Sequence, residues 1–378
     1  GVVFGARDPQ VTSVPVIYGT RRTPGTLIHQ ETSADNQYLF QNFVVSEGDV
    51  TAITVGSEPA DVIGQATYVK QKVFLGADAG LQTGLPSEDA WINDSPQWTT
   101  SHHLKGLASA LFRFKYDRTN FARTPKLFFT VQGKTVSSGV LGNPSQDNSA
   151  EVLYDYLTDT RFGAGIPAGK IDVSSFTTCR GQCNATYSSS SVKKFTCNVI
   201  LDSKETVLSN VRKILATCRG QLHFVSGKYR MFIPGTYSGS PVVAFTTDNI
   251  LAGIQVDYGS KQTRANQVIA KWIDPDERYE AGEAIYPDPT NDSSVYNTYL
   301  TEDNSLSLVK QVTLDGVTSF QQARYLAAIM ARQSRNSIQV TFETLGDGAE
   351  CIPGDIITIT HSSFSWSSKE FQVQTLRL

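Results

Sequence analysis

Cysteine is scarce and unevenly placed in this chain of 378 residues. The chain has 5 cysteines, an odd count, and none of them precedes residue 179. Small secreted domains that depend on disulfides carry cysteines in pairs and at high density. The pattern argues against a disulfide-stapled scaffold. The five residues are Cys179, Cys183, Cys197, Cys218 and Cys351.

An excess of charge of one sign is also missing. Lysine and arginine total 33, aspartate and glutamate total 36, and the formal net charge is −3. Proteins that wrap nucleic acid or lie on anionic membranes usually carry a clear basic excess. The charge balance therefore argues against both classes. The 40% of apolar residues and 10% of aromatic residues indicate a globular chain and not a disordered one.

Long apolar runs are missing as well. The longest nearly pure apolar run, Tyr325–Ala331, is far shorter than the ~18 residues needed to span a bilayer. The first nine residues do not combine a basic segment with an apolar core, as a signal peptide does. The chain begins with glycine instead of methionine, and we expect a processed chain or a piece of a longer one.

Catalytic motifs are not found either. The sequence contains no His-Glu-x-x-His and no Gly-x-Ser-x-Gly. The segment Gly163–Lys170 faintly resembles a phosphate loop, but Ile171 stands where a magnesium-binding hydroxyl is required and Pro167 lacks an N–H. We favour a plain loop between two helices over a nucleotide site. The adjacent His102 and His103 would point to opposite faces of a strand, so we expect a surface or loop pair.

Acidic residues are plentiful but form no recognisable catalytic pair in the sequence. They include Asp274, Asp276, Glu277 and Asp288, which we interpret as solvated loop charges. No catalytic residue, cofactor site or metal site is therefore predicted.

Two of the cysteines share a predicted helical face with Phe176, and Cys218 lies on the apolar stripe of another predicted helix. A metal site with Cys197 and His223 is an alternative, but structural zinc usually uses two close Cys/His pairs. Buried cysteine behaves as a small hydrophobic residue. We expect reduced and unligated thiols in a core, with a metal site or a disulfide as the minor alternatives.

Short strands dominate the first part of the sequence. Apolar or alternating runs between Gly, Pro and Asp predict strands over 14–18, 38–46, 107–116 and 126–132. Residues 76–101 are rich in Gly, Asp, Ser and Pro and predict a long loop. We therefore predict a β-rich domain over residues 1–146, with an insertion around 55–101.

Helical patterns enter in the middle of the sequence. Asn148–Glu151 resembles a capping box before an apolar stripe, Asp172 can cap a short second helix, and Asp202–Glu205 forms another capping box. Gly220 would end the third helix. Ser226-Gly227 then predicts a two-residue hairpin turn between strands 221–225 and 228–233. We predict an α+β domain over residues 147–258.

The last third returns to strands around one helix. Strands are predicted over 266–272, 338–343, 355–360 and 371–376, with a helix over about 318–334 capped by Thr318. The polar stretch 287–303 predicts a loop, and Pro353-Gly354 predicts a tight turn. We predict a β-rich domain over residues 259–378. The predicted class of the whole chain is α+β and β-dominated, with several small β-rich domains and three or four short helices.

A family resemblance rests on short segments that occur in a fixed order. Near the start, Val14–Arg22 with Gly25-Thr26, and Val45–Asp49 with Ile53, resemble segments of phage tail-hub proteins. From residue 103 onward the chain is similar to the tip attachment protein J family of phage lambda. The similar segments are His103–Gly106, Leu153–Gly165, Phe195–Asn198, Asn266–Pro275 and Cys351–Ile356.

This resemblance implies a structural virion protein, the central hub of a long-tailed phage tail tip. Such hubs form a homotrimer at the distal end of the tail. They close the tail tube, adapt its sixfold symmetry to threefold, contact distal tail proteins and anchor tip, fibre or receptor-binding proteins. They also line the channel for genome ejection, so phage DNA passes without specific binding, and they serve host attachment by meeting the cell envelope indirectly. The implied fold is a ring of small β-domains with peripheral α+β domains.

Family members are longer and carry a receptor-reading region that is not found here. We expect either the structured N-terminal part of a hub or a hub that leaves receptor binding to another protein. Two other functions remain open: a surface-binding adhesin module, and a tail-associated cell-wall hydrolase with a carboxylate pair in a cleft.

We predict that the sensitive positions are packing and turn residues. Gly163 and Gly165 close the best-matched segment, in a connection where positive φ and a close approach favour glycine. Gly227 lies in the hairpin turn, and Pro353 and Gly354 form the turn before the strand at 355–360.

Overall fold

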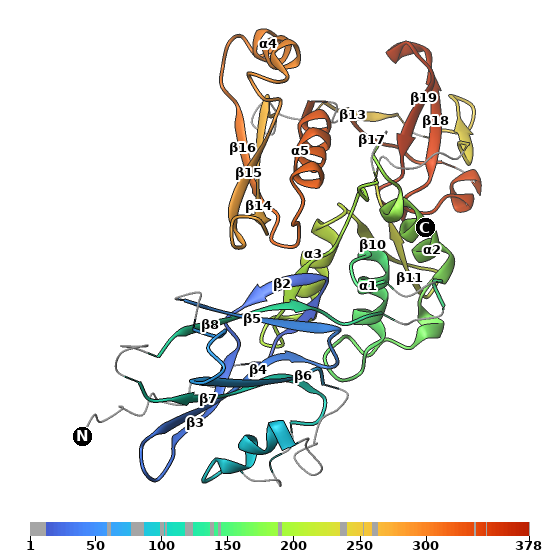
Figure 1. Cartoon of the computed structure of the whole chain (residues 1–378). Helices are drawn as coiled ribbons and strands as arrows, with labels where there is room; N and C mark the ends of the chain where they lie inside the picture. The colour runs from blue at the N-terminus through green and yellow to red at the C-terminus, as the bar shows by residue number, and fades with distance from the viewer. Residues whose placement is uncertain are drawn as a thin grey trace.

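A computed structural model describes most of the chain (Figure 1). The described residues are 13–58, 62–76, 87–98, 102, 104–117, 124–136, 140–142, 145–187, 191–234, 240–251, 253–258, 264–335, 338–344 and 346–377.

The N-terminal part consists of two facing sheets. One has the order β3-β4-β7-β6 and the other has the order β2-β8-β5. Large side chains such as Phe112 and Phe129 are fully buried between them, together with Val45 and Val131. The strands are β2 (Thr20–Thr23), β3 (Thr26–Thr32), β4 (Tyr38–Glu47), β5 (Ala52–Glu58), β6 (Val69–Phe74), β7 (Leu107–Lys115) and β8 (Lys126–Gln132).

The predicted strands 38–46, 107–116 and 126–132 are confirmed as β4, β7 and β8. The other four strands were not predicted, because most of their residues are polar or only partly buried. The long loop expected over 76–101 contains a 3-10 helix, η1 (Ser87–Asp94), within its described residues. Trp91 and Ile92 of η1 are buried against Leu111, so this segment packs onto the outer side of β7.

A short strand pair connects the N-terminal part to the middle of the chain. The fully buried β1 (Val16–Tyr18) pairs antiparallel with β9 (Val199–Leu201). The side chain of Ile17 lies in the core of the β-rich part, whereas Val16 and Tyr18 lie in the core of the helical part. Since successive strand residues point to opposite faces, β1 contributes to both cores.

The middle of the chain forms three helices and a hairpin. The helices are α1 (Ser149–Thr158), α2 (Val173–Asn184) and α3 (Val207–Ala216), with a 3-10 turn, η2 (Ala168–Lys170), before α2. The hairpin pairs β10 (Gln221–Val225) with β11 (Lys228–Phe232) as predicted. Its turn residues, Ser226 and Gly227, have φ of 51° and 78°, the left-handed conformations that a tight hairpin requires.

The helix ends differ in part from the predicted caps. The Asn148 side chain accepts hydrogen bonds from the N–H groups of Ala150 and Glu151, as a cap should. The Glu151 carboxylate pairs instead with Arg180. The cap of α3 is Thr206 and not Asp202, whose carboxylate accepts from the N–H of Lys204 in a turn.

The residues predicted to begin α2 and to end α3 were also wrong. The Asp172 side chain makes no capping hydrogen bond to α2. After α3, the positive φ is taken by Arg219 (55°) and not by Gly220. The N–H of Gly220 still satisfies a carbonyl of the last helical turn by donating to Leu215, at 2.9 Å.

The C-terminal third contains a mixed sheet covered by the longest helix. Strands β14 (Gln267–Asp274), β15 (Glu280–Tyr286) and β16 (Val309–Thr313) have the order β15-β14-β16. Helix α5 (Phe320–Arg335) packs on β14 and β15. Its first turn is capped by Ser319 and not by Thr318, because Ser319 accepts from the N–H groups of Gln322 and Ala323.

The loop predicted over 287–303 is wrong for most of its length. Residues Ser293–Glu302 form helix α4. None of its residues is buried, so the sequence has no apolar stripe to indicate a helix. The described residues therefore contain five α-helices, where three or four were predicted.

The remaining strands form two small sheets that share a core of their own. Strands β12 (Val243–Phe245), β18 (Ile356–His361) and β19 (Trp366–Gln372) form one sheet, and β13 (Gln255–Asp257) pairs with β17 (Gln339–Thr341). Phe245, Cys351 and Ile359 are buried between them. The strand predicted over 371–376 begins earlier, at Trp366, and ends at Gln372. Two 3-10 turns, η3 (Gly346–Glu350) and η4 (Ser362–Phe364), flank β18.

The fold class is α+β and β-dominated, as predicted. The largest hydrophobic core joins α1, α2, α3, β14 and α5, so residues on both sides of position 258 share it. The predicted domain limits at 146 and 258 stay predictions. Within the described residues, no helix is both long and apolar enough to cross a membrane.

Candidate functional site

The best-matched sequence segment, Leu153–Gly165, is helix α1 and the tight loop that follows it. The loop folds back on the helix end: the N–H groups of Ala164, Gly165 and Ile166 donate to carbonyls of Tyr156, Asp159 and Leu157 at 2.8–3.0 Å. These bonds satisfy carbonyl groups that a helix end leaves without partners. The loop is therefore fixed by the backbone of α1.

The two glycines in this loop are required for different reasons. Gly165 has a φ of 64°, which favours glycine. Gly163 does not have a positive φ, contrary to our expectation. A Cβ atom on Gly163 would instead lie 2.0 Å from the carbonyl oxygen of Tyr156 and 2.8 Å from that of Asp159. The expected close approach is present at Gly163, and the left-handed backbone is present at Gly165.

Polar side chains attach α1 to the β-rich part of the chain. The Asp155 carboxylate accepts a hydrogen bond from the Tyr18 hydroxyl at 2.6 Å and forms an ion pair with Lys134 at 2.9 Å. Lys134 also pairs with Asp159 at 3.3 Å and lies over the ring of Phe162. We call Tyr18, Lys134, Asp155 and Asp159 the junction ion cluster. Burial and the nearby Asp155 carboxylate raise the pKa of Tyr18 well above its usual value, so its hydroxyl stays a donor.

Two amide side chains, Asn198 and Gln322, link three distant parts of the chain. Asn198 accepts from the N–H of Thr20 at 2.8 Å through its side-chain oxygen and donates to Thr318 at 2.8 Å. Gln322, which has no exposed surface, accepts from the N–H of Thr196 at 3.1 Å. Its amide nitrogen donates to the carbonyls of Thr196 and Thr217 at 2.9 and 2.8 Å. We call Asn198 and Gln322 the amide bridge.

The amide bridge joins β2, the segment 195–198 that leads into β9, and the start of α5. A buried amide with matched donors and acceptors specifies one arrangement of these segments, because a displaced arrangement would leave polar groups unpaired. The junction ion cluster and the amide bridge together hold the β-rich, helical and C-terminal parts in one relative position.

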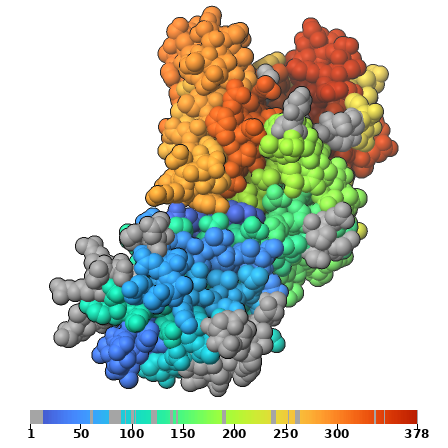
Figure 2. Space-filling model, in the orientation of Figure 1, coloured from blue at the N-terminus to red at the C-terminus, as the bar shows by residue number. Residues whose placement is uncertain are grey.

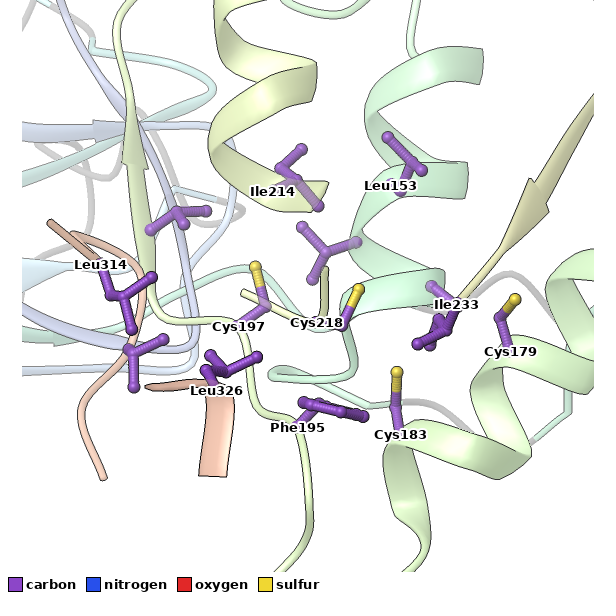
Figure 3. Close-up of a cluster of buried hydrophobic side chains, with 14 of the residues drawn as sticks. Leu153, Cys179, Cys183, Phe195, Cys197, Ile214, Cys218, Ile233, Leu314 and Leu326 are labelled. Carbon is purple, nitrogen blue, oxygen red and sulfur yellow. The ribbon is translucent and has the colours of Figure 1, made fainter. Parts of the chain in front are cut away.

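Four of the cysteines lie in the same large core. Figure 3 shows Cys179, Cys183, Cys197 and Cys218 among Leu153, Phe195, Ile214 and Ile233. All five cysteines are buried and free of disulfides. Burial raises the pKa of Cys179 to about 12. The hydrogen bond with Cys218 and burial raise the pKa of Cys183, and burial also raises the pKa values of Cys197 and Cys351.

These thiols should be unreactive in the folded protein. A thiol reacts as the thiolate, and the raised pKa values of Cys179, Cys183, Cys197 and Cys351 lower their thiolate fractions near neutral pH. The hydrogen bond with Cys183 lowers the pKa of Cys218, but Cys218 has no exposed surface, so burial keeps the reagent from this thiol as well. The chain is treated with a maleimide or an aromatic disulfide, once in its native state and once unfolded in urea. After the time in which all five thiols react in urea, we expect no thiol of the native chain to have reacted. Mass measurement of both samples checks this. A native thiol that reacts as fast as in urea would contradict the buried placement.

The other residues singled out in the sequence lie away from the junction. Gly227 has open space around it, so a side chain there meets only the cost of a positive φ. Gly354 has a φ of 103° and lies against Phe232 of β11, and the neighbouring Pro353 is buried. The turn of Pro353 and Gly354 therefore packs on the hairpin, and the five residues do not form one site.

The residues considered for other chemistry are also separated. His102 stacks on Trp98 with ring centroids 5.1 Å apart, and His103 lies outside the described residues. No group of three or more His, Cys, Asp or Glu side chains in the described part of the chain is placed to hold a metal ion. Sequence reasoning missed Lys134 and Gln322, because single polar residues with distant partners leave no local pattern. Asn198 lies in a segment that the family resemblance did mark.

Two sequence comparisons match this chain to phage tail and baseplate proteins. Residues 211–374 match a family model described as a putative phage tail protein. A curated relative, the baseplate hub protein pb3 of Escherichia phage T5, is 24% identical over 380 aligned residues. The match covers 93% of this chain and 37% of the relative, so the chain spans well under half of the relative's length.

A solved structure shares the fold over nearly the whole chain. A protein in the virion of a native gene transfer agent particle superposes with a TM-score of 0.67 at 11% identity. The match covers 98% of this chain and 83% of that protein. Together, the comparisons support a structural protein of a phage tail or baseplate hub, without pointing specifically to the tip attachment protein J family.

Proposed function

We propose that this chain is the central hub of a long-tailed phage tail tip, located at the distal end of the tail. In this role it forms a homotrimer that closes the tail tube and adapts its sixfold symmetry to threefold. It contacts tube and distal tail proteins, anchors tip, fibre or receptor-binding proteins, and thereby serves host attachment. During genome ejection the trimer surrounds the passing DNA without binding it specifically.

The observation that carries this proposal is the match to a baseplate hub protein over 93% of the chain. Because the match covers 93% of the chain, it is not confined to one shared module. A solved structure shares the fold over 98% of the chain. We further propose that residues 1–146, 147–258 and 259–378 act as three structural units of the hub.

The physical character of the chain supports a placement role. Buried polar links fix the relative position of its parts, as a scaffold between symmetry-related neighbours requires. The net charge of −3 is compatible with a channel wall, because a basic wall would retain DNA through phosphate contacts. We propose no catalytic role. No observation favours the adhesin or the cell-wall hydrolase over the hub.

A reconstruction of the tail tip of the intact virion tests this proposal. It would show whether the fold occupies the distal end of the tail and how many copies surround the tail axis.

A further inference from the structure

The strands β12, β13, β17, β18 and β19 form a unit with a hydrophobic core of its own. We call the described residues of 242–258 and 338–377 the terminal sheet unit. All members of its core, such as Phe245 and Ile359, come from the unit itself. The largest core of the chain draws its described members from the remaining residues. Figure 2 shows the unit at the upper right, with β18 and β19 in red and residues around β12 in yellow.

Two connections between this unit and the rest of the chain lie side by side. The chain passes between the two parts three times: after β11, after β13 and after α5. At the unit, Asp257 at the end of β13 is the register partner of Gln339 at the start of β17. Beyond the unit, the N–H of Ala265 donates to the hydroxyl of Ser334 in α5 at 3.1 Å. The connections after β13 and after α5 therefore begin at one pair of neighbours and end at another.

The rest of the chain is fixed close to all three connections. Ile233, just after β11, and Ala265 are buried in the largest core. Arg335, the last residue of α5, forms an ion pair with Asp303 at 2.7 Å. The amide bridge also holds the start of α5, but neither this bridge nor the junction ion cluster includes a residue of the terminal sheet unit. A change in the direction of the chain is therefore confined to the connections themselves.

The unit contacts the hairpin β10–β11 through one aromatic ring. Strand alternation places Met231 and Ile233 in the largest core and Phe232 on the opposite face. The Phe232 ring stacks on His223 with the ring centroids 5.1 Å apart. Gly354 of the unit lies against this ring, because a Cβ atom on Gly354 would be 3.0 Å from Phe232. No hydrogen bond or ion pair between two described residues crosses from the unit to the rest.

We propose that the terminal sheet unit is a rigid body that tilts relative to the rest of the chain. The two side-by-side connections form the hinge, because small backbone rotations in a few connecting residues turn a whole unit. The Phe232 ring is the seat on which Gly354 rests in the structure. Two parts of a chain are expected to move relative to each other unless their interface is large and hydrophobic, and here the two cores are separate.

The inference goes beyond the proposed function and does not rest on the trimer. The terminal sheet unit takes one segment from each side of position 258. It is therefore a mechanical subdivision within the two C-terminal units proposed above.

Distances between pairs of spin labels test the hinge. The labels are attached to cysteines introduced into the full chain, since the five native cysteines are buried. The hinge pair joins Ser367→Cys in β19 to Ser294→Cys in α4, and the control pair joins Lys70→Cys in β6 to the same position in α4. All three positions are exposed. We expect the distance distribution of the hinge pair to be about twofold wider than that of the control pair, or more.

Removing the seat should widen the distribution of the hinge pair further. Phe232→Ala takes away the ring on which Gly354 rests and should leave the control pair unchanged. Phe224→Ala is the matched variant on the same hairpin, because the Phe224 ring is 62% exposed, and it should change neither pair. Circular dichroism shows that each variant is folded.

The outcomes separate the hinge, the seat and the hub proposal. Equal widths for the two pairs in the chain with Phe232 intact would overturn the hinge. A wide distribution for the control pair would also overturn it, because the rest of the chain would not be one rigid body. A hinge pair that does not respond to Phe232→Ala would overturn the seat. The hub proposal fails separately, if tail-tip maps lack a threefold assembly of this fold.

Discussion

Replacing Gly163 by alanine is expected to lower the free energy of unfolding by roughly 3–5 kcal/mol, the range of severe steric substitutions. The added Cβ would lie 2.0 Å from the carbonyl oxygen of Tyr156, and the neighbouring obstacle is backbone, which cannot rotate away. The loop would have to leave α1 and release the hydrogen bonds of Ala164 and Ile166. Urea unfolding of the purified chain measures the loss.

Gly169→Ala is the matched control for this substitution. Gly169 lies in η2, six positions further along the chain, and a Cβ there meets nothing within 4 Å. We expect a change of less than about 1 kcal/mol, since Ala costs less backbone entropy than Gly. If both variants unfolded at the same urea concentration, Gly163 would not be a close-approach position. In phage, Gly163→Ala should reduce the yield of assembled tails while Gly169→Ala leaves it unchanged.

Gln322→Leu is expected to destabilise the chain by about 3–5 kcal/mol. The leucine would leave the N–H of Thr196 and the carbonyls of Thr196 and Thr217 without their partner, the fully buried Gln322 side chain. Each unpaired buried group costs about 1–3 kcal/mol. The amide bridge would be lost, so α5 would no longer be tied to the segment 195–198 that leads into β9.

The neighbouring Gln321 provides the control on the same helix. Gln321 is exposed, and Gln321→Leu should change the free energy of unfolding by less than about 0.5 kcal/mol. Thermal and urea unfolding of the two variants gives the comparison. Equal effects of the two substitutions would mean that the gain in apolar burial offsets the lost hydrogen bonds at position 322 and that the bridge does not determine stability.

Local patterns in the sequence predicted the elements that bury apolar residues. The apolar runs of β4, β7 and β8 and the apolar stripe of α1 reflect the burial of these segments, and burial determines which pattern of apolar residues a segment carries. The hairpin turn at Ser226-Gly227 was predicted because few residues tolerate positive φ. Helix α4 was missed because none of its residues is buried, so no period is imposed on its sequence.

The candidate site was only partly predictable for the same physical reason. The importance of the two loop glycines could be predicted, because no other residue type fits where a Cβ atom is not tolerated. The reason predicted for Gly163 was wrong: its Cβ atom would clash with backbone, and its φ is not positive. Gln322 and Thr196 lie 126 positions apart, and Lys134 and Asp155 lie 21 apart. Such pairs depend on tertiary packing, which brings together segments that share no pattern in the sequence. Only a structure places them side by side.

The central claim is that this chain forms a threefold hub at the distal end of a phage tail. A reconstruction of intact virion tails, computed without imposed symmetry at the tip, tests it most directly. We expect three copies of this fold around the tail axis, next to the last ring of the tube, with the junction ion cluster and the amide bridge intact in each copy. A tip that contains this fold as a single copy, as six copies, or only at the outer end of a fibre would contradict the claim.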